Sequence, residues 1–150
     1  MMNAPRAEPK NSLRLDDFLC FAVYSASHAF NRVYKPLLDK LKLTYPQYLA
    51  MVVLWELGGQ TVGSLGEKLF LESSTLTPML KRLEAMGYIA RVRDADDERQ
   101  VRIKLTSSGR ALREKAKAIP SCILDATGFK AEDVAKLTKD MTALRKTLAR

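Results

Sequence analysis

The side chains of this chain that are best suited to redox chemistry are two cysteines, Cys20 and Cys122, and a set of tyrosines. A thiolate is the nucleophile that attacks a peroxide oxygen, and a phenol hydroxyl that donates a hydrogen bond to sulfur stabilises this charged form. Tyr24, Tyr34 and Tyr45 are the candidate donors. Helical cysteines are also common as inert core residues and helical tyrosines as interface residues, so plain packing remains the alternative interpretation.

Cys20 and Tyr34 cannot meet within one chain if both lie on the same straight helix. They are fourteen positions apart, and a rise of about 1.5 Å per residue separates them by about 21 Å. If two copies of this helix cross antiparallel at a two-fold axis near Ser27, each Cys20 lies opposite Tyr34 of the other subunit. A homodimer of this kind would therefore create two equivalent redox sites between its subunits.

The composition argues against several other classes of protein. With one histidine, His28, and two cysteines, the chain cannot assemble a four-ligand Cys/His zinc site. We expect no metal and no cofactor, and we expect His28 to be a packed or solvated helix residue. The longest apolar run, 48–55, is too short to cross a membrane. Because the N-terminal residues also lack the pattern of a signal sequence, we expect a cytoplasmic protein with no membrane contact.

A second group of side chains is suited to contacting nucleic acid, and it lies on the polar face of one predicted helix. Thr75 and Thr77 are short enough to let the helix approach base edges, and Lys81 and Arg82, about two turns later, can meet phosphates. The chain has a net charge of +8 and a pI of about 9.6, which favours a polyanionic partner. A merely solvated helix face is the alternative. The full set of candidate residues on this face is Ser74, Thr75, Thr77, Pro78, Lys81 and Arg82.

Helical periodicity predicts the elements that position the redox residues. Apolar residues recur every three or four positions from Leu15 to about Leu41 and predict one long helix. The next helix begins at a capping box formed by Thr44 and Gln47 and ends at Gly58. It is apolar nearly all round, so we expect it to be central.

A helix-turn-helix follows. Its helices are expected over 61–70 and 73–86, and the second helix is expected to be capped by Ser73 or Ser74 and ended by Gly87. This second helix carries the polar face described above, so it is the one that would enter a DNA groove.

The periodicity then changes from helical to alternating. Residues 88–93 and 101–106 are predicted to be two strands joined by a polar tip. Arg99, in this tip, is the candidate side chain for a minor groove. Closing helices are expected from Thr106 or Ser107 to about Ala118, with an interruption at Pro120, and from Ala131 onward.

Together these elements predict a mainly α-helical fold with a small β-hairpin wing, which is a winged helix-turn-helix. After a flexible tail at 1–14, a single domain is expected over 15–150. Within this domain, helices at about 15–41 and 107–149 are expected to form the dimer. Residues at about 45–106 are expected to form the DNA-binding lobe.

The order of these elements resembles the MarR family of bacterial regulators over residues 15–149. The resemblance implies a dimer with interleaved terminal helices that binds pseudo-palindromic operator DNA. It also implies that Arg99 enters the minor groove and that Asp97 shapes the wing, where we place Arg91 as a second shaping residue. The motif residues that carry it are Tyr88-Ile89, Asp97-Glu98-Arg99 and Leu105-Thr106-Ser107-Ser108-Gly109.

A narrower resemblance, to the organic-hydroperoxide-sensing OhrR branch of that family, implies a function for the cysteines. It implies that organic hydroperoxides oxidise Cys20 to a sulfenic acid, that Tyr34 and Tyr45 bond to it across the dimer, and that Cys122 is a resolving cysteine. A disulfide to the partner would then release the operator and derepress a detoxifying gene. The segments that carry this resemblance are 19–25 (LCFAVYS), 34–38 (YKPLL) and 43–48 (LTYPQY).

Two other functions stay open at this point. One is a regulator of the same fold that responds to a phenolic or drug-like ligand in the dimer crevice, with incidental cysteines. The other is a thiol peroxidase that uses Cys20 and Cys122. Because the chain lacks a Thr-x-x-Cys signature and carries a face suited to DNA, we expect a regulator and not an enzyme.

Overall fold

The computed structural model describes residues 13–150, so most of the tail expected at 1–14 lies outside the described residues. The structure is mainly helical with one small sheet, as expected. In chain order its elements are a 3-10 turn at Leu15–Asp17, α1 (Leu19–Asp39), α2 (Tyr45–Leu57), β1 (Gln60–Thr61), α3 (Val62–Leu69), α4 (Ser73–Ala85), β2 (Ile89–Arg93), β3 (Val101–Leu105), α5 (Ser107–Ala116), α6 (Ile119–Thr127) and α7 (Ala131–Leu148).

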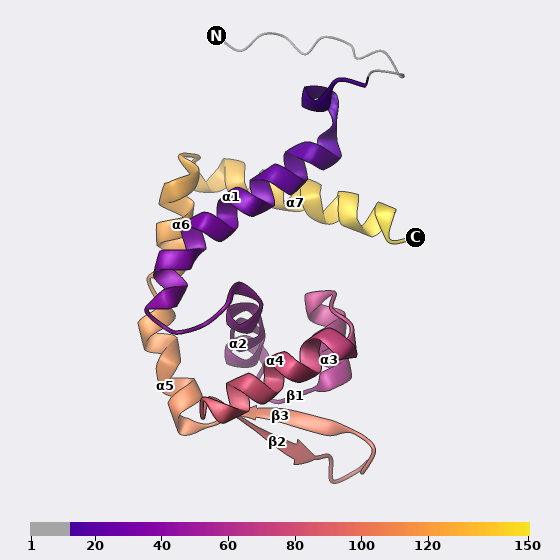
Figure 1. The fold of residues 1–150 in the computed structure, drawn as a ribbon, viewed down its shortest axis with the longest axis vertical. Coiled ribbons are helices and arrows are strands. Elements are labelled where there is room, and N and C mark those ends of the chain that lie inside the picture. The colour runs from indigo at the N-terminus through magenta and orange to yellow at the C-terminus, as the bar shows by residue number, and fades with distance from the viewer. Residues whose placement is uncertain (1–12) are drawn as a thin grey trace.

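The chain forms two parts that face each other (Figure 1). The first, which we call the helical arm, consists of α1, α6 and α7. The second, the winged lobe, consists of α2, α3, α4 and the three strands. The turn between α1 and α2 and the helix α5 join the two parts on the same side of the molecule, so the opposite side is open in the ribbon view.

The apolar core lies in the winged lobe. On the inner side of α4, Leu76, Leu80 and Leu83 are at most 1% exposed. Burial on one side of α4 leaves its opposite face at the surface. The largest fully buried side chains of the chain are Met51, Leu54, Leu65, Leu76, Leu80, Leu83, Ile89 and Ile103.

The sheet contains the predicted hairpin and one additional short strand. β2 and β3 pair antiparallel, with Arg91 opposite Ile103, and β1 adds to the other edge of β3, with Gln60 also opposite Ile103. The sequence analysis missed β1, because two residues are too few to show a strand periodicity. This strand ties the start of the helix-turn-helix to the wing.

The predicted helix caps of α2 and α4 are largely confirmed. The backbone N–H of Thr44 donates to Gln47 Oε1 at 2.9 Å, and that of Gln47 donates to Thr44 Oγ1 at 3.3 Å, which is the expected capping box. Gly58 and Gly87 follow the two helices with φ angles of 74° and 84°, a region that favours glycine. α2 is therefore fixed at both ends by local sequence, and α4 at its C-terminal end.

Some helix boundaries differ from the prediction. α1 begins at Leu19, because Phe18 before it is extended, with φ −88° and ψ 112°. The expectation that Ser73 or Ser74 caps α4 is wrong: Glu72 occupies the N-cap position, and its side chain makes no capping hydrogen bond. A serine in the first turn of a helix gives the same sequence pattern as a serine at the N-cap position, so the pattern alone does not distinguish the two positions.

The break between the closing helices also lies earlier than predicted. α5 ends at Ala116, and α6 begins at Ile119, so Pro120 lies in the first turn of α6 and does not interrupt a helix. Proline is tolerated at this position because the first backbone N–H groups of a helix have no intrahelical acceptor. None of the helices between residues 13 and 150 is long and apolar enough to cross a membrane.

Candidate redox and nucleic-acid sites

Cys20 is the second residue of α1 and is exposed, with a free thiol. Tyr24 lies one helical turn further along and is 62% exposed. Its ring packs on His28, with the ring centroids 4.3 Å apart, so His28 is a partner of Tyr24 on the helix surface. Among residues 13–150, no group of three or more His, Cys, Asp or Glu side chains is arranged to hold a metal ion.

The structure brings together the other two tyrosines expected near the sulfur, Tyr34 and Tyr45. Tyr34, from the second half of α1, lies with its ring centroid 4.7 Å from that of Tyr45, at the start of α2. Tyr48 extends the cluster at 5.8 Å from Tyr34. Sequence reasoning missed Tyr48, although its position one turn after Tyr45 was a signal for the same helix face.

Burial raises the pKa of these phenols. Loss of solvation, with a smaller effect of Tyr45 and Tyr48, raises the pKa of Tyr34 to about 12. Burial also raises the pKa of Tyr45 and of Tyr48 above the usual value. At neutral pH the three hydroxyls are therefore hydrogen-bond donors and not phenolates.

Within one chain this tyrosine cluster and Cys20 lie toward opposite ends of α1. Cys122, in the first turn of α6, is exposed and also has a free thiol. α6 packs on α1, and Figure 1 shows that it crosses α1 away from the end at which α1 begins. The two cysteines are therefore held on different parts of the helical arm and are not bonded to each other.

The helical arm exposes apolar side chains that a single chain leaves uncovered. On α1, Val23, Phe30 and Val33 are 37–45% exposed, and no residue of α7 is buried. A helix stripe with a spacing of three or four residues is typical of a surface that packs on another helix. The larger exposed apolar residues of the arm are Leu19, Val23, Phe30, Val33, Leu137, Met141 and Leu148.

The polar face of α4 lies at the surface, as expected for a helix that enters a groove. Thr75, Lys81 and Arg82 are exposed, as are Ser74 and Pro78. Thr77 differs, because it is half-buried and its Oγ1 donates to the carbonyl of Ser73 at 2.8 Å. Its hydroxyl proton is thus used within the helix, and only the oxygen lone pairs and the methyl group remain for a base edge.

The turn before α4 brings two helices into close contact. A Cβ atom on Gly66 would lie 2.7 Å from the carbonyl oxygen of Leu71, so only glycine allows this approach. Phe70 follows α3 in the left-handed conformation, with φ 58°, and its ring is 64% exposed. Sequence reasoning did not single out Phe70, because a glycine is the usual signal for this position.

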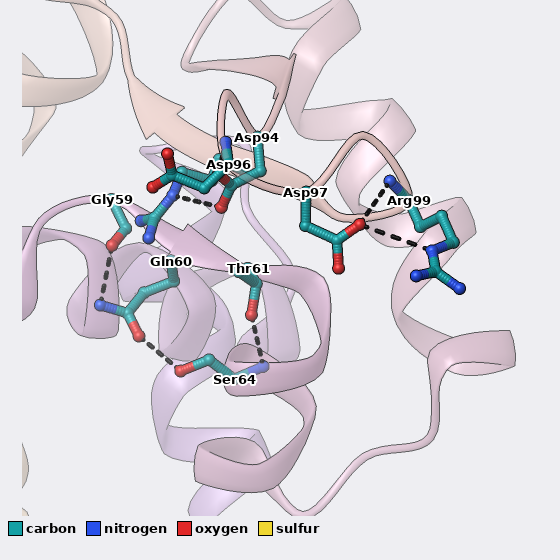
Figure 2. A network of polar contacts seen from close by, with 9 residues as sticks. Gly59, Gln60, Thr61, Ser64, Asp94, Asp96, Asp97 and Arg99 are labelled. Carbon is teal, nitrogen blue, oxygen red and sulfur yellow. Dashed lines mark hydrogen bonds and ion pairs between the residues drawn. The ribbon is translucent and has the colours of Figure 1, made fainter.

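The wing is held by carboxylates on its own tip, as Figure 2 shows. Asp97 Oδ1 accepts from the backbone N–H of Arg99 at 3.1 Å and lies 3.6 Å from its Nε, while the Arg99 side chain is 94% exposed. Arg91 instead points back to the lobe, where its Nε lies 3.4 Å from Glu84 Oε2 of α4. Arg99 is thus presented outward and Arg91 ties the base of the wing to α4.

Asp94 is the wing residue that the sequence analysis missed. It accepts from the backbone N–H of Asp96 at 2.8 Å and from Arg102 Nε at 3.0 Å (Figure 2). These hydrogen bonds, the backbone one first, lower the pKa of its carboxyl. An aspartate directly after a strand that is followed by further polar residues was an available signal for such a turn.

The winged lobe is also joined firmly to α5. Trp55 Nε1 donates to the carbonyl of Gly109 at 2.9 Å, and a Cβ atom on Gly109 would overlap the carbonyl oxygen of Tyr88. Beside this joint lies an open hollow of about 400 Å³ with an aromatic wall and two cations. It is lined by Trp55, Arg113, Glu114, Ala116, Lys117 and Pro120.

Comparisons with known proteins agree with this geometry. A family model described as transcriptional regulator SarA/Rot matches residues 32–116. The organic hydroperoxide resistance transcriptional regulator of Bacillus subtilis (strain 168) is 48% identical over 136 residues, 91% of this chain and 92% of that protein. The HTH-type transcriptional regulator TtmR of Methylorubrum extorquens (strain PA1) is 47% identical over 148 residues, 99% of this chain and 74% of that protein.

Solved structures share the fold. AbfR of Staphylococcus epidermidis is 38% identical with a TM-score of 0.77, covering 91% of this chain and 95% of that one. Other structures describe AbfR overoxidized and bound to DNA (TM-score 0.76, 37% identical, 92% and 96% covered) and AbfR with a disulfide formed (0.65, 39%, 88% and 93%). MarR of E. coli, 22% identical with a TM-score of 0.69 over 85% and 96% of the chains, shows the fold alone.

The matches span the helical arm as well as the winged lobe, and the relatives are transcriptional regulators and not enzymes. The chain therefore belongs to the SarA/Rot family of transcriptional regulators, and its fold is the one seen in MarR.

Proposed function

We propose that this regulator is a homodimeric repressor that senses organic hydroperoxides through Cys20 and releases its operator when Cys20 forms a disulfide with Cys122 of the partner subunit. The observation that carries the proposal is the position of Cys20. It is a free, exposed thiol in the first turn of a helix whose apolar face is uncovered. The 48% identical relative named for organic hydroperoxide resistance supports the choice of oxidant.

A second copy of the chain is the proposed cover for the helical arm. α1 and α7 expose aliphatic or aromatic side chains over several turns, which suits an isologous helix interface. If the two copies of α1 cross near Ser27, the phenols of Tyr34 and Tyr45 of one subunit face Cys20 of the other. Tyr24 lies one turn from Cys20 and lines the same site.

The protonated phenols can donate the hydrogen bonds that stabilise a sulfur anion. Phenols are protonated at neutral pH even at their ordinary pKa, so Tyr34 and Tyr45 can donate hydrogen bonds there, and burial raises their pKa further from neutrality. A phenol that donates to the sulfur of Cys20 stabilises the thiolate, which is the form that reacts with a peroxide.

The proposed reaction has two balanced steps. The Cys20 thiolate attacks one oxygen of the O–O bond, which breaks, and the alkoxide that leaves takes up a proton and departs as an alcohol. Sulfur is oxidised to a sulfenic acid as the peroxide is reduced. The thiolate of Cys122 of the partner subunit then attacks the oxidised sulfur, the S–S bond forms, and hydroxide leaves and is protonated to water.

The winged lobe is proposed to bind a pseudo-palindromic operator through the exposed face of α4 and the wing. Thr75 and the accessible atoms of Thr77 are assigned to base edges, and Lys81 and Arg82 to phosphates. Arg99, extended from the wing tip, is assigned to the minor groove. Ser74 and Pro78 complete the contacting face, while Asp97 and Arg91 hold the wing in position.

These assignments give each part of the chain a separate proposed role. The single domain spans 15–150, with the dimer formed by helices at about 15–41 and 107–149 and the DNA contacts made by residues at about 45–106. The disulfide would fix the arm in an arrangement that turns the two winged lobes out of register with the half-sites.

The test is operator binding measured by fluorescence anisotropy with and without cumene hydroperoxide. The probe is a duplex that the wild-type protein selects from a random-sequence pool. We expect peroxide to release the wild type and not Cys20→Ser. Cys122→Ser is expected to react at Cys20 but to form no cross-linked dimer on a non-reducing gel. Tyr88→Phe, the same change at a tyrosine of the lobe outside the proposed site, keeps both cysteines and should be released like the wild type.

Release of Cys20→Ser by peroxide would overturn the cysteine mechanism. The hollow lined by Trp55, Arg113 and Lys117, in which Lys117 pairs with Glu114, favours one second candidate: a regulator that binds an aromatic anion beside Arg113. That function predicts release by salicylate, a phenolic anion, in Cys20→Ser and the wild type alike. Repeated turnover of peroxide with dithiothreitol at a rate that exceeds operator release would instead indicate a thiol peroxidase.

A further inference from the structure

The open side of the molecule, opposite the two connections between arm and lobe, is bridged by one side-chain contact. The guanidinium carbon of Arg145, in the last turn of α7, lies 4.1 Å from the centroid of the Phe70 ring. Figure 1 shows the C-terminal part of α7 extending over the side of the lobe that carries α3. The contact therefore joins the far end of the arm to the turn of the helix-turn-helix.

The strained backbone at Phe70 indicates that its side chain makes an interaction that compensates for the strain. Phe70 ends α3 in the left-handed conformation, with φ 58° and ψ 40°, and its N–H donates to the carbonyl of Gly66. Glycine adopts this conformation without strain, whereas a bulky residue there is unusual. Because the ring is 64% exposed, burial in the lobe does not compensate for the strain.

The Arg145 guanidinium is attracted to the face of the Phe70 ring, and a glycine at position 70 would offer no such attraction. A cation within about 6 Å of a ring centroid is attracted by the electrons of the ring, and arginine is the more frequent partner. At exposed sites this contact shifts an equilibrium by about two- to fivefold. A single pair of that strength cannot fold the chain, but it is enough to bias how two joined parts are oriented.

We propose that Phe70 and Arg145 form a latch that fixes the orientation of the winged lobe on the helical arm, and thereby sets the spacing of operator half-sites that the dimer accepts. The inference rests on the proposed function, because half-site spacing has a meaning only for a dimer on a palindromic operator. Both residues are positioning residues, since neither is assigned a contact with DNA.

The physical reason is that recognition by a dimer depends on the separation of its two α4 helices. Half-sites lie about one helical turn apart, so one inserted base pair moves them by about 3.4 Å and rotates them by about 35°. A lobe held at both sides of the molecule cannot follow this displacement. A lobe held only through the α1–α2 turn and α5 can pivot. It therefore loses more orientational freedom when it binds the operator of the correct spacing.

The test compares binding to two duplexes by fluorescence anisotropy: the operator selected by the wild type from a random-sequence pool, and the same duplex with one base pair inserted between the half-sites. We expect Phe70→Gly to bind the selected operator about 5- to 25-fold more weakly, because two latches are lost per dimer. We also expect the penalty for the insertion to fall by a similar factor. Circular dichroism checks folding, which the relief of strain at this position favours.

Matched variants separate the latch from general effects. Phe70→Leu keeps a side chain in the left-handed position and removes only the aromatic face, so it should lose the spacing preference as Phe70→Gly does. Lys146→Met removes the same charge as Arg145→Met from the neighbouring position and should keep the wild-type spacing preference. Phe70→Gly combined with Arg145→Met should be no weaker than either change alone.

The outcomes are distinct. A spacing penalty in Phe70→Gly equal to that of the wild type, or additive effects of the two latch substitutions, overturns the latch while leaving the proposed function in place. Selection of no two-fold-symmetric duplex by the wild type overturns the proposed function, and the role of the latch in spacing falls with it.

Discussion

The winged lobe buries most of the apolar side chains that its sequence pattern predicts, whereas α1, α6 and α7 of the helical arm bury only Leu38 and Ile119 among their described residues. Every buried apolar residue among those described lies between Leu38 and Ile119, and α7 contributes none. Phe30 and Met141 follow the same helical spacing as Leu76 and Leu80, yet they remain 45% and 39% exposed. The lobe is therefore stabilised by its own core, whereas the arm exposes the apolar surface that the proposed second subunit would cover.

The largest expected effect comes from the lobe. Leu83 is fully buried, so Leu83→Ala leaves a cavity and should lower the free energy of unfolding by about 2–5 kcal/mol. Chemical denaturation measures this loss, and sedimentation equilibrium should give an unchanged dimer dissociation constant. Leu137→Ala, the same change at an exposed position of α7, should raise the dimer dissociation constant and leave the free energy of unfolding nearly unchanged. A large loss of dimer affinity in Leu83→Ala would contradict the separation of the two parts.

The next effect concerns the arm. Phe30→Asp places a charge in the proposed interface at two symmetric positions and removes the apolar burial, which should weaken the dimer by about 3 kcal/mol or more, on the order of a hundredfold. Sedimentation velocity over a range of concentrations measures the shift. Leu57→Asp is the matched control, because Leu57 is 50% exposed but lies at the end of α2 in the lobe. Equal effects of the two variants would remove the reason to place the interface on α1.

The comparison also explains how far the sequence could predict this structure. Caps and turns depend on residues close in the chain, so the capping box at Thr44 and the glycines at Gly58 and Gly87 were predictable. An apolar stripe, by contrast, shows that a helix packs on another surface but does not identify that surface. The stripe of α1 looks the same whether its partner is in the same chain or in another one.

The site was predictable where residue type and position agree and was missed where they conflict. Lys81, Arg82 and Arg99 are exposed at the positions that the pattern predicted. Phe70 was missed because local rules favour glycine in a left-handed helix end, and Asp94 because the wing tip contains several acidic residues. Only the fold shows that Asp94 alone reaches across the hairpin to Arg102.

A smaller effect should appear where arm and lobe meet, at the tyrosine cluster. A phenol whose pKa is raised to about 12 in the folded state, above its ordinary value of about 10, binds more protons than the unfolded chain between these pH values. Stability from Tyr34 is thus fully present below pH 10 and is lost as the pH rises toward 12. Urea unfolding between pH 9 and 11 should show a shallower decline for Tyr34→Phe than for the wild type.

The control for the pH effect is Tyr24→Phe, since Tyr24 lies on the exposed surface of α1. It should retain the slope of the wild type, because lysine deprotonation affects both proteins equally. If Tyr34→Phe kept that slope as well, the buried contact between α1 and α2 would not be the source of the pH dependence.

The smallest effect on global stability is expected in the wing. Asp94→Asn keeps an acceptor for the backbone N–H of Asp96 but removes the charge beside Arg102, so the lobe should stay folded while amide hydrogen exchange accelerates at Asp96 and Gln100. Because the pKa of Asp94 is lowered, its ionic contribution is present above its ordinary pKa and disappears as the pH falls through the lowered value. The wild type should therefore exchange like Asp94→Asn only at acidic pH. Exchange that is identical in the two proteins at pH 7 would mean that the hairpin register between β2 and β3, and not the carboxylate, holds the wing.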